Sequence, residues 1–471
     1  MPTRQDQLHS YQFTIQRVVA ALVMRETDPP QSPFRRIAAA TIAGVMVTAL
    51  ALAGAAVFGI ISPGGGTGWR DGNAVIVERQ SGARFVYRDG KLHPVTNYTS
   101  ALLILGSAQP KVVYVSRGSI AGVPRGTPLG IPAAPDSLPA ARDLVGAPWT
   151  LCSAQANDGR GGTRTESVLF VGGGPASGGR PLTEEALLAR HPDGTLYLVW
   201  HHRRYLIREP AVVLPALGWD AAAAQPAAPA LLNALAAGAD LARIAVADRG
   251  KKSTRVPGAR NGEVFVVENQ GGSRQYAVAT RDGLAPVTQV QADILITDPA
   301  TVELLGQTKP RPLGQGEYAS IPKARELVPG GELAAPAATP ALAKPAGGGG
   351  VCTVVRDASG PAEVRVDVPV PPAADAVPTG SRTGTGTVLV DRVLVPPGRG
   401  AVVEALASPQ APGGALSVVT DLGTRHEVSG VEVLAMLGFS GVRPLRLPAG
   451  LVALLPAGRA LDPAAARSPA S

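Results

Sequence analysis

A chain of 471 residues has room for about two to four domains. Its 56 glycines and 44 prolines favour short strands and frequent turns over long helices. The net charge is +8, but the basic residues are scattered without an aromatic-interleaved basic patch, which argues against a nucleic-acid-binding protein. The positive charge is compatible with anionic lipid headgroups or cell-wall polymers as neighbours.

Residues 1–36 are predicted to form a short cytosolic helix and a connector. Apolar side chains recur every three or four residues and make one stripe, consisting of Leu8, Tyr11, Ile15, Val18 and Leu22. Asp28-Pro29-Pro30 ends the helix, because proline removes a backbone donor and clashes with the preceding turn. A free helix this small cannot bury its own stripe. Because the stripe is narrow and only moderately apolar, we expect it to dock on a partner protein rather than on the membrane surface.

Residues 37–61 contain no charge and no proline, and a helix of this length spans roughly 37 Å, enough to cross a membrane. The alternatives are a buried core helix or a cleaved signal peptide, whose apolar region is shorter, about 7–15 residues, and nearer the start of the chain. Arg35 and Arg36 directly precede the apolar run, and a Gly-rich tether, 62–71, follows it. The positive-inside rule therefore predicts a single-pass protein with a cytoplasmic N-terminus and an extracytoplasmic body.

The body begins with a pattern that is repeated about 190 residues later. Residues 72–106 and 262–298 each read as two strands, an Asp-Gly turn and a further apolar run. Arg88-Asp89-Gly90 aligns with Arg281-Asp282-Gly283, and a one-residue gap then aligns the two Pro-Val-Thr triplets. Two shorter units, 190–220 and 414–442, resemble each other in the same way. We therefore predict a tandem duplication with four small repeats.

Between the repeats lie segments expected to form a shared central core. They are a first half at 107–189, a junction at 221–261 and a second half at 299–413, with a C-terminal tail at 443–471. Repeats of this size cannot bury much apolar area alone. The expected fold class is a single transmembrane helix followed by an extracytoplasmic α+β, β-rich body, elongated and pseudo-two-fold, with the four repeats around the core.

The chain has two cysteines, Cys152 and Cys352, one in each half of the predicted duplication. In an oxidising compartment such a pair most simply forms one structural disulfide, and two free core thiols are the alternative. A bond between them closes a loop of about 200 residues, for which the chain-entropy model gives at most roughly 5 kcal/mol of stabilisation.

No catalytic motif occurs in the sequence. Gly250-Lys251-Lys252-Ser253 is the nearest approach to a phosphate-binding loop, but Ala245 occupies the position of the required upstream glycine, so an exposed basic loop is the better interpretation. The six histidines show no metal-ligand spacing, and on one strand the adjacent His201 and His202 would point to opposite faces. The sequence predicts no catalytic residue, no metal site and no cofactor.

The whole chain nevertheless resembles the EccB family, the single-pass membrane component of actinobacterial type VII (ESX) secretion systems. Any one fragment is weak, but their order on both sides of a membrane span is specific. The fragments are Gln7-Leu8 with Tyr11-Gln12-Phe13 and Arg17, Pro94-Val95-Thr96-Asn97, Gly130-Ile131-Pro132-Ala133-Ala134-Pro135-Asp136-Ser137-Leu138-Pro139, Trp149-Thr150-Leu151-Cys152, Asp282-Gly283 with Pro286-Val287-Thr288-Gln289, and Leu461-Asp462-Pro463. One departure is Gln16, where the family often carries a second basic residue.

The resemblance implies a structural subunit of a secretion complex in the bacterial cytoplasmic membrane. The implied partners are EccC-, EccD- and EccE-like membrane subunits and a mycosin protease, with a homodimer or higher oligomer formed through the extracytoplasmic body. The resemblance also implies four repeats around a disulfide-linked core. Some family members have been described as ATPases, for which this chain offers no nucleotide-binding motif. The competing hypotheses are a membrane-anchored module that binds cell-wall peptidoglycan and an extracytoplasmic ATPase.

Overall fold

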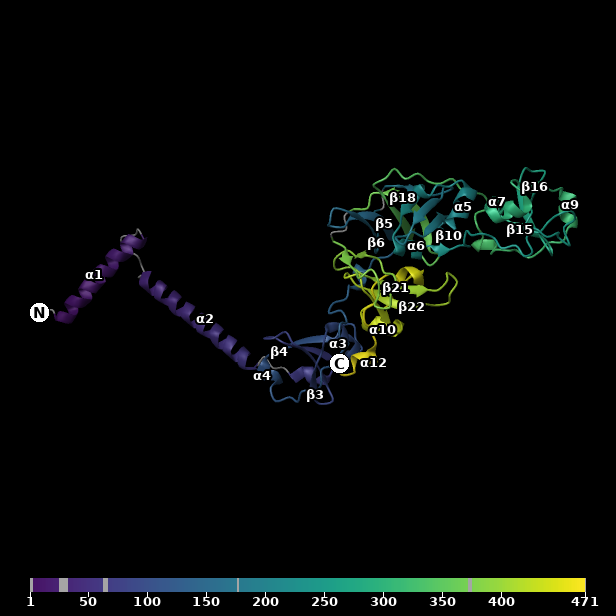
Figure 1. Cartoon of the computed structure of the whole chain (residues 1–471). Coiled ribbons are helices and arrows are strands. Elements are labelled where there is room, and N and C mark those ends of the chain that lie inside the picture. Colours follow the sequence, from purple (N-terminus) through teal and green to yellow (C-terminus); the bar gives the residue numbers. More distant parts are fainter. Residues whose placement is uncertain (1–2, 25–32, 62–66, 176–177, 372–374, 471) are drawn as a thin grey trace. The chain divides into compact units, whose positions relative to one another are not determined.

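The computed structural model of the chain describes residues 3–24, 33–61, 67–175, 178–371 and 375–470 (Figure 1). It divides into two compact units, of which the first comprises Met1–Pro94 with Lys111–Gly126 and the second Val95–Pro110 with Thr127–Ser471. Each unit has its own sheets and its own buried apolar side chains.

Two long helices begin the chain (Figure 1): α1 (Arg4–Met24) and α2 (Pro33–Ile61). At the start of α1, the Thr3 amide and hydroxyl donate hydrogen bonds of 3.0 and 2.6 Å to the Asp6 carboxylate, which satisfies a free backbone donor of the first turn. The predicted apolar helix is present and begins four residues before residue 37. Its stretch Ile37–Val57 has a mean hydropathy of 2.1 and is 0% buried, as a membrane-crossing helix requires.

The first unit continues with a four-stranded sheet of order β3-β2-β1-β4. Its elements are a short 3₁₀ turn η1 (Thr67–Asp71), β1 (Ala74–Glu78), β2 (Arg84–Arg88), β3 (Lys91–Pro94), β4 (Lys111–Val115) and α4 (Arg117–Ile120). The expected Asp-Gly turn joins β2 to β3, with positive φ at Asp89 (50°) and Gly90 (76°). Trp69 from η1 is fully buried and packs with apolar side chains of the strands, so this sheet has a small core of its own.

The second unit contains three further small sheets. The first comprises β8 (Leu187–Arg190), β9 (Leu196–Trp200), β10 (Arg203–Ile207), β11 (Gln225–Pro226) and β12 (Ala236–Ala237); the next comprises β13 (Val264–Glu268), β14 (Arg274–Thr280), β15 (Gly283–Val287) and β16 (Arg311–Pro312). The last comprises β21 (Ala401–Leu406), β22 (Ala415–Val419), β23 (Arg425–Val428) and β24 (Leu445–Pro448).

All four small sheets follow one chain path. Three consecutive strands pair antiparallel, a helix follows the third strand along the chain, and a later strand pairs parallel to the first, as β4 does with β1, β11 with β8, β16 with β13 and β24 with β21. The helices that follow the third strands are α3 (Tyr98–Leu105), α5 (Pro210–Leu217), α7 (Gln289–Thr297) and α10 (Val431–Met436). The chain then returns beside the third strand, through bridges such as Leu92 with Arg125, Leu284 with Lys323 and Arg425 with Ala457.

A seven-stranded sheet of order β19-β20-β6-β5-β17-β18-β7 occupies the middle of the second unit. Its strands are β5 (Trp149–Asn157), β6 (Thr163–Phe170), β7 (Arg180–Pro181), β17 (Gly350–Val355), β18 (Pro361–Val368), β19 (Val377–Pro378) and β20 (Arg392–Leu394). Two hairpins, β5–β6 and β17–β18, meet through the antiparallel pair β5–β17. The outer strand of each hairpin pairs with a strand from the other half of the chain, β20 with β6 and β7 with β18.

Shorter helices complete the second unit. They are α6 (Pro229–Ala234), α8 (Pro299–Leu305), α9 (Gln315–Ser320), α11 (Ala449–Val452) and α12 (Pro463–Ala466), with 3₁₀ turns η2 (Ala141–Asp143), η3 (Ala221–Ala223) and η4 (Gly331–Leu333). The structure therefore shows a β-rich body with mixed parallel and antiparallel sheets, preceded by one apolar helix long enough to cross a membrane.

His201 and His202 form the two-residue turn between β9 and β10, not part of a strand. Trp200 pairs with Arg203, and both histidines have positive φ, 45° and 63°, a conformation that two-residue hairpins normally assign to Asn-Gly. The His201 ring stacks on the Trp200 ring with the centroids 3.6 Å apart. The left-handed backbone costs about 1–2 kcal/mol at a residue with a Cβ, so this turn is strained.

Replacing the pair, His201→Asn with His202→Gly, is expected to stabilise the protein by about 1 kcal/mol, because the strain is relieved while the stacking on Trp200 is lost. Chemical unfolding followed by circular dichroism measures the difference. Unchanged or lower stability would show that the stacked ring outweighs the backbone strain.

Candidate functional site

The stripe predicted for docking lies on α1. All five side chains, Leu8, Tyr11, Ile15, Val18 and Leu22, are exposed, with fractions between 44% and 76%. Phe13 and Val23 are exposed as well, although neither belongs to the stripe. A helix that leaves this much apolar surface open is typical of one that binds a partner. The spacing of the stripe was visible in the sequence, whereas the two additional side chains fall outside its period.

The two arginines expected to set the membrane orientation, Arg35 and Arg36, belong to the first turns of α2. Their side chains lie outside the residues whose surroundings the structure describes. Thr41 and Thr48, inside the apolar stretch, donate their hydroxyls to the carbonyls of Ile37 and Gly44, each at 2.8 Å. The polar groups of the span are therefore satisfied within the helix, as a lipid environment demands.

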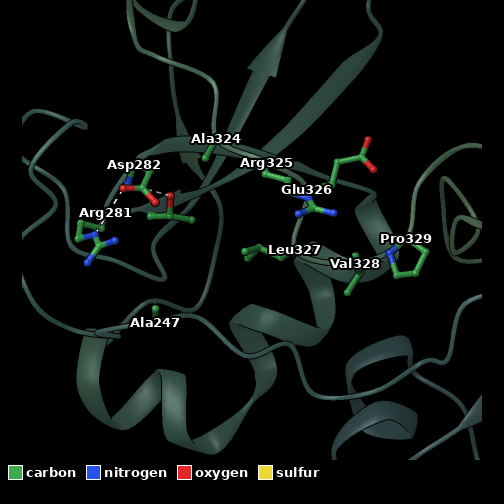
Figure 2. Close-up of a pocket in the computed structure, with 10 residues that line it drawn as sticks. Ala247, Arg281, Asp282, Ala324, Arg325, Glu326, Leu327, Val328 and Pro329 are labelled. Carbon is green, nitrogen blue, oxygen red and sulfur yellow. Dashed lines mark hydrogen bonds and ion pairs between the residues drawn. The ribbon is translucent and has the colours of Figure 1, made fainter.

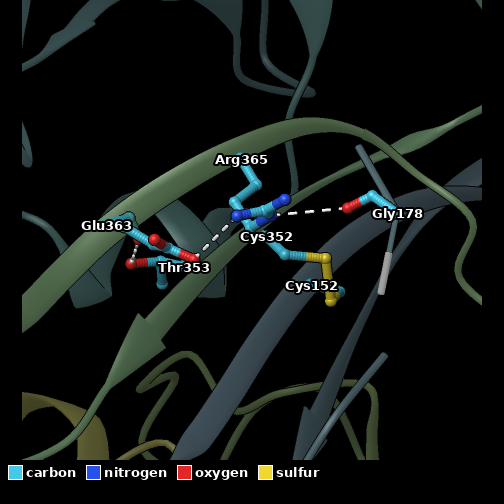
Figure 3. Close-up of a disulfide and its surroundings, with 6 residues drawn as sticks. All are labelled: Cys152, Gly178, Cys352, Thr353, Glu363 and Arg365. Carbon is cyan, nitrogen blue, oxygen red and sulfur yellow. Dashed lines mark hydrogen bonds and ion pairs between the residues drawn. A yellow bond between two sulfur atoms is a disulfide. The ribbon is translucent and has the colours of Figure 1, made fainter. Parts of the chain in front are cut away.

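Cys152 and Cys352 form a disulfide at the centre of the seven-stranded sheet (Figure 3). The two residues are direct register partners on β5 and β17, with their Cα atoms 4.0 Å apart, and both side chains are buried. They lie in a small apolar cluster with Val168, Phe170 and Val368. The bond thus joins the two hairpins where they meet, and it is the pairing favoured by the sequence.

Arg365 lies beside this disulfide and holds β18 to the chain segment before β7. Its guanidinium contacts the Glu363 carboxylate at 3.1 Å and donates to the Gly179 carbonyl at 2.9 Å, with a longer contact to Gly178 (Figure 3). Gly178 and Gly179 are separated from Arg365 by more than 180 positions in the chain. The sequence contains no local signal for this contact.

A second polar network joins the two halves along β6 and β20. The Asp391 carboxylate accepts hydrogen bonds from the Ser167 amide (2.8 Å), the Ser167 hydroxyl (2.6 Å) and the Ser381 hydroxyl (2.6 Å). Next to it, Arg392 contacts the largely buried Glu166 at 2.7 Å. Because these groups satisfy one another, the network helps to fix the register of β6 against β20.

An open pocket of about 780 Å³ beside the third small sheet is lined by both charged and apolar residues (Figure 2). The charged residues lining it come from the β14–β15 turn, Arg281 and Asp282, and from the returning segment, Arg325 and Glu326. Arg281 contacts its neighbour Asp282 at 3.4 Å. Among the described residues, no group of three or more His, Cys, Asp or Glu side chains is placed to hold a metal ion.

The stretch from Gly250 to Ser253 is a turn, and no helix begins there. Lys251 forms an ion pair with Asp248 at 2.7 Å, and the Ser253 hydroxyl donates to the Thr280 carbonyl at 2.7 Å. A phosphate-binding loop needs free backbone amides at a helix N-terminus. This turn lacks that geometry.

Burial lowers the pKa of His426, which lies on β23 with its Nδ1 3.0 Å from the Arg459 carbonyl. The folded protein therefore resists protonation of this ring, whereas the unfolded chain takes up a proton near the ordinary pKa of about 6.5. The contribution of His426 is present at neutral pH and is lost as the pH falls below that value.

His426→Gln is expected to flatten the decline of stability between about pH 7 and pH 5, because the unfolded chain then has one proton fewer to bind. Unfolding curves at stepped pH for the wild type and the variant test this. Parallel declines in the two proteins would show that other groups set the dependence; His202 is a candidate, because burial first, and then His201, lower its pKa.

These features together define a membrane-anchored protein with a β-rich body whose central sheet is cross-linked by a disulfide. The family model described as "Type VII secretion system ESX-1, transport TM domain B" matches residues 1–470. The chain belongs to this family, the EccB proteins of type VII secretion systems.

Known relatives agree with this assignment. The chain is 30% identical to the "ESX-3 secretion system ATPase EccB3" of Mycolicibacterium smegmatis, covering 97% of this chain and 88% of the relative. It is 33% identical to the "ESX-2 secretion system ATPase EccB2" of Mycobacterium tuberculosis over 62% of this chain and 59% of that protein.

Two solved structures show the same fold. A chain of an intact ESX-5 inner membrane complex aligns with a TM-score of 0.60 at 26% identity, covering 100% of this chain and 96% of that one. The EccB3 dimer from the ESX-3 core complex aligns with a TM-score of 0.61 at 28% identity, covering 84% of this chain and 100% of that one.

Proposed function

We propose that this protein is a structural subunit of a type VII secretion complex in the cytoplasmic membrane. The single observation that carries the proposal is the match of the family over residues 1–470, which includes α1, α2 and the β-rich body in one order. In this role α1 docks neighbouring subunits through its exposed stripe, α2 anchors the chain, and the body organises the far side of the membrane.

Its orientation places the N-terminus in the cytoplasm and the body outside it. Five basic residues precede the apolar stretch within 36 positions, whereas Arg70 and Arg79 are the first two that follow it. The disulfide supports this orientation, because such bonds persist in oxidising compartments and are rare in the cytosol.

The body is proposed to be a tandem duplication of four repeats about a pseudo-two-fold axis. The shared chain path of the four small sheets supports the repeats. The central sheet supports the pseudo-symmetry, because it is built from two hairpins that meet at Cys152 and Cys352 and exchange outer strands.

The proposed partners are EccC-, EccD- and EccE-like membrane subunits and a mycosin protease. A second copy of this chain is proposed to bind through the body; the description of a solved relative as an EccB3 dimer from the ESX-3 core complex supports a dimer. Removing the protein from its host is expected to stop export of the substrates of its type VII system, and the full-length chain is expected to restore it. Unchanged export would contradict the proposal.

The named ATPase activity of the relatives is not part of this proposal, because the turn at 250–253 lacks a phosphate-binding geometry. Peptidoglycan binding is the alternative role. Saturable retention of the purified full-length protein on insoluble peptidoglycan would favour it.

A further inference from the structure

The segments that form the four-stranded sheet of the first unit and its connections carry most of the net positive charge of the chain. Between residues 67 and 94 and between 111 and 126 there are eight basic and three acidic residues, a net charge of +5 out of +8 for the whole chain. The basic residues are Arg70, Arg79, Arg84, Arg88, Lys91, Lys111, Arg117 and Arg125. A domain this small and this basic attracts anionic surfaces.

One edge of this sheet is also apolar. Strand β4 is the outermost strand on its side, and alternate residues Val112 and Tyr114 are 40% and 60% exposed. Lys111 and Arg117 flank them, both exposed. We call these four residues, Lys111, Val112, Tyr114 and Arg117, the β4 patch.

The residue types of the β4 patch are those that membrane proteins place at the level of the lipid headgroups. Tyrosine places an apolar ring and a polar hydroxyl at headgroup level, and lysine and arginine extend their charges toward phosphate groups while their stems contact apolar surface. Arg117 keeps a contact with Glu78 at 3.0 Å, but its side chain is 76% exposed and so remains accessible to a second anion.

The patch contacts the first described element after α2. Lys111 lies close to Gly68, because its Nζ is 3.8 Å from the point where a Cβ on Gly68 would be. Gly68 belongs to η1, the first described element after α2. Gly68 is seven positions after Ile61, the last residue of α2, which limits the distance between their Cα atoms to about 25 Å. The sheet is therefore held near the headgroup layer whatever path the tether takes.

We propose that the β4 patch binds the membrane surface through anionic lipid headgroups and so seats the first sheet on the bilayer from which α2 emerges. Charge complementarity and the short tether identify the lipid as the occupant. This inference requires that α2 span the membrane but does not depend on the role in secretion, so a failure of either proposal leaves the other standing.

Hydrogen–deuterium exchange of the full-length protein in lipid nanodiscs tests the proposal. Discs of phosphatidylcholine alone are compared with discs that also contain phosphatidylglycerol. Amides of residues 111–117 are expected to exchange several-fold more slowly in the anionic discs, and high salt should remove the difference because it screens the charges. Amides of β1 and β2 report whether the sheet is folded in every sample.

Two matched variants complete the test. Lys111→Glu with Tyr114→Ser is expected to abolish the lipid-dependent protection. Lys91→Glu makes the same charge change on β3, at the opposite edge of the sheet, and should leave most of the protection. Equal exchange of the wild type in both kinds of disc would overturn the proposal, as would protection that appears only when peptidoglycan fragments are added.

Discussion

Removing the disulfide, by Cys152→Ala with Cys352→Ala, is expected to lower the free energy of unfolding of the β-rich body by up to about 5 kcal/mol. The bond closes a loop of 200 residues, and opening it restores conformational freedom mainly to the unfolded chain. The two hairpins of the central sheet would then be held together by the backbone pairing of β5 with β17 and by apolar packing. Denaturant unfolding of the purified protein without reductant measures the loss.

Three comparisons isolate the covalent contribution. Each single alanine variant should lower the free energy of unfolding nearly as much as the double variant does, because either change breaks the same bond. Val168→Ala removes methyl groups from the same apolar cluster, opposite Cys152, and should cost only about 1–2 kcal/mol. Reductant should destabilise the wild type but leave the double variant unchanged. A double variant within about 1 kcal/mol of the wild type would show that the cross-link contributes little.

The double substitution Tyr11→Asp with Ile15→Asp is expected to release the protein from its complex. Both side chains lie on the exposed stripe of α1, so the changes leave the fold of the body intact while placing two carboxylates in the proposed interface. Burying a charge without a partner costs several kcal/mol, which corresponds to a loss of binding of at least about 100-fold. Affinity purification from membranes followed by quantitative mass spectrometry measures the co-purified subunits.

A matched control uses the opposite face of the same helix. His9→Asp with Gln16→Asp adds the same two carboxylates at positions about half a turn away from the stripe and should leave co-purification intact. Equal recovery of partners with the stripe variant and with the wild type would show that α1 is not the docking element.

Local signals were sufficient to predict several elements of the fold. The uncharged run 37–61 forms α2, the stripe of period three to four lies on α1, and Asp89-Gly90 forms a hairpin turn because that dipeptide adopts positive φ readily. The likeness of residues 72–106 to 262–298, on which the predicted repeats depend, was visible because the Asp-Gly turns and the flanking strands lie in short contiguous segments.

The parallel strands and the central sheet could not be predicted in the same way. Strands β11, β12 and β16 are two residues long and leave no pattern in the sequence. Strand β21 belongs to the last small sheet although it precedes residue 414, where the shorter unit was expected to begin. In the central sheet the exchanged pairing of β6 with β20 joins residues 224 apart, and such register depends on tertiary packing. The turn at His201 was missed because it lacks glycine and asparagine.

As a member of the EccB family, this chain is expected to work as a subunit of a type VII secretion complex. The most direct test is to isolate the full-length protein from native membranes in mild detergent and to identify the proteins that travel with it at high molecular mass. We expect recovery together with EccC-, EccD- and EccE-like membrane subunits. Recovery of the protein alone, or only with cell-wall fragments, would contradict it and favour an independent wall-binding anchor.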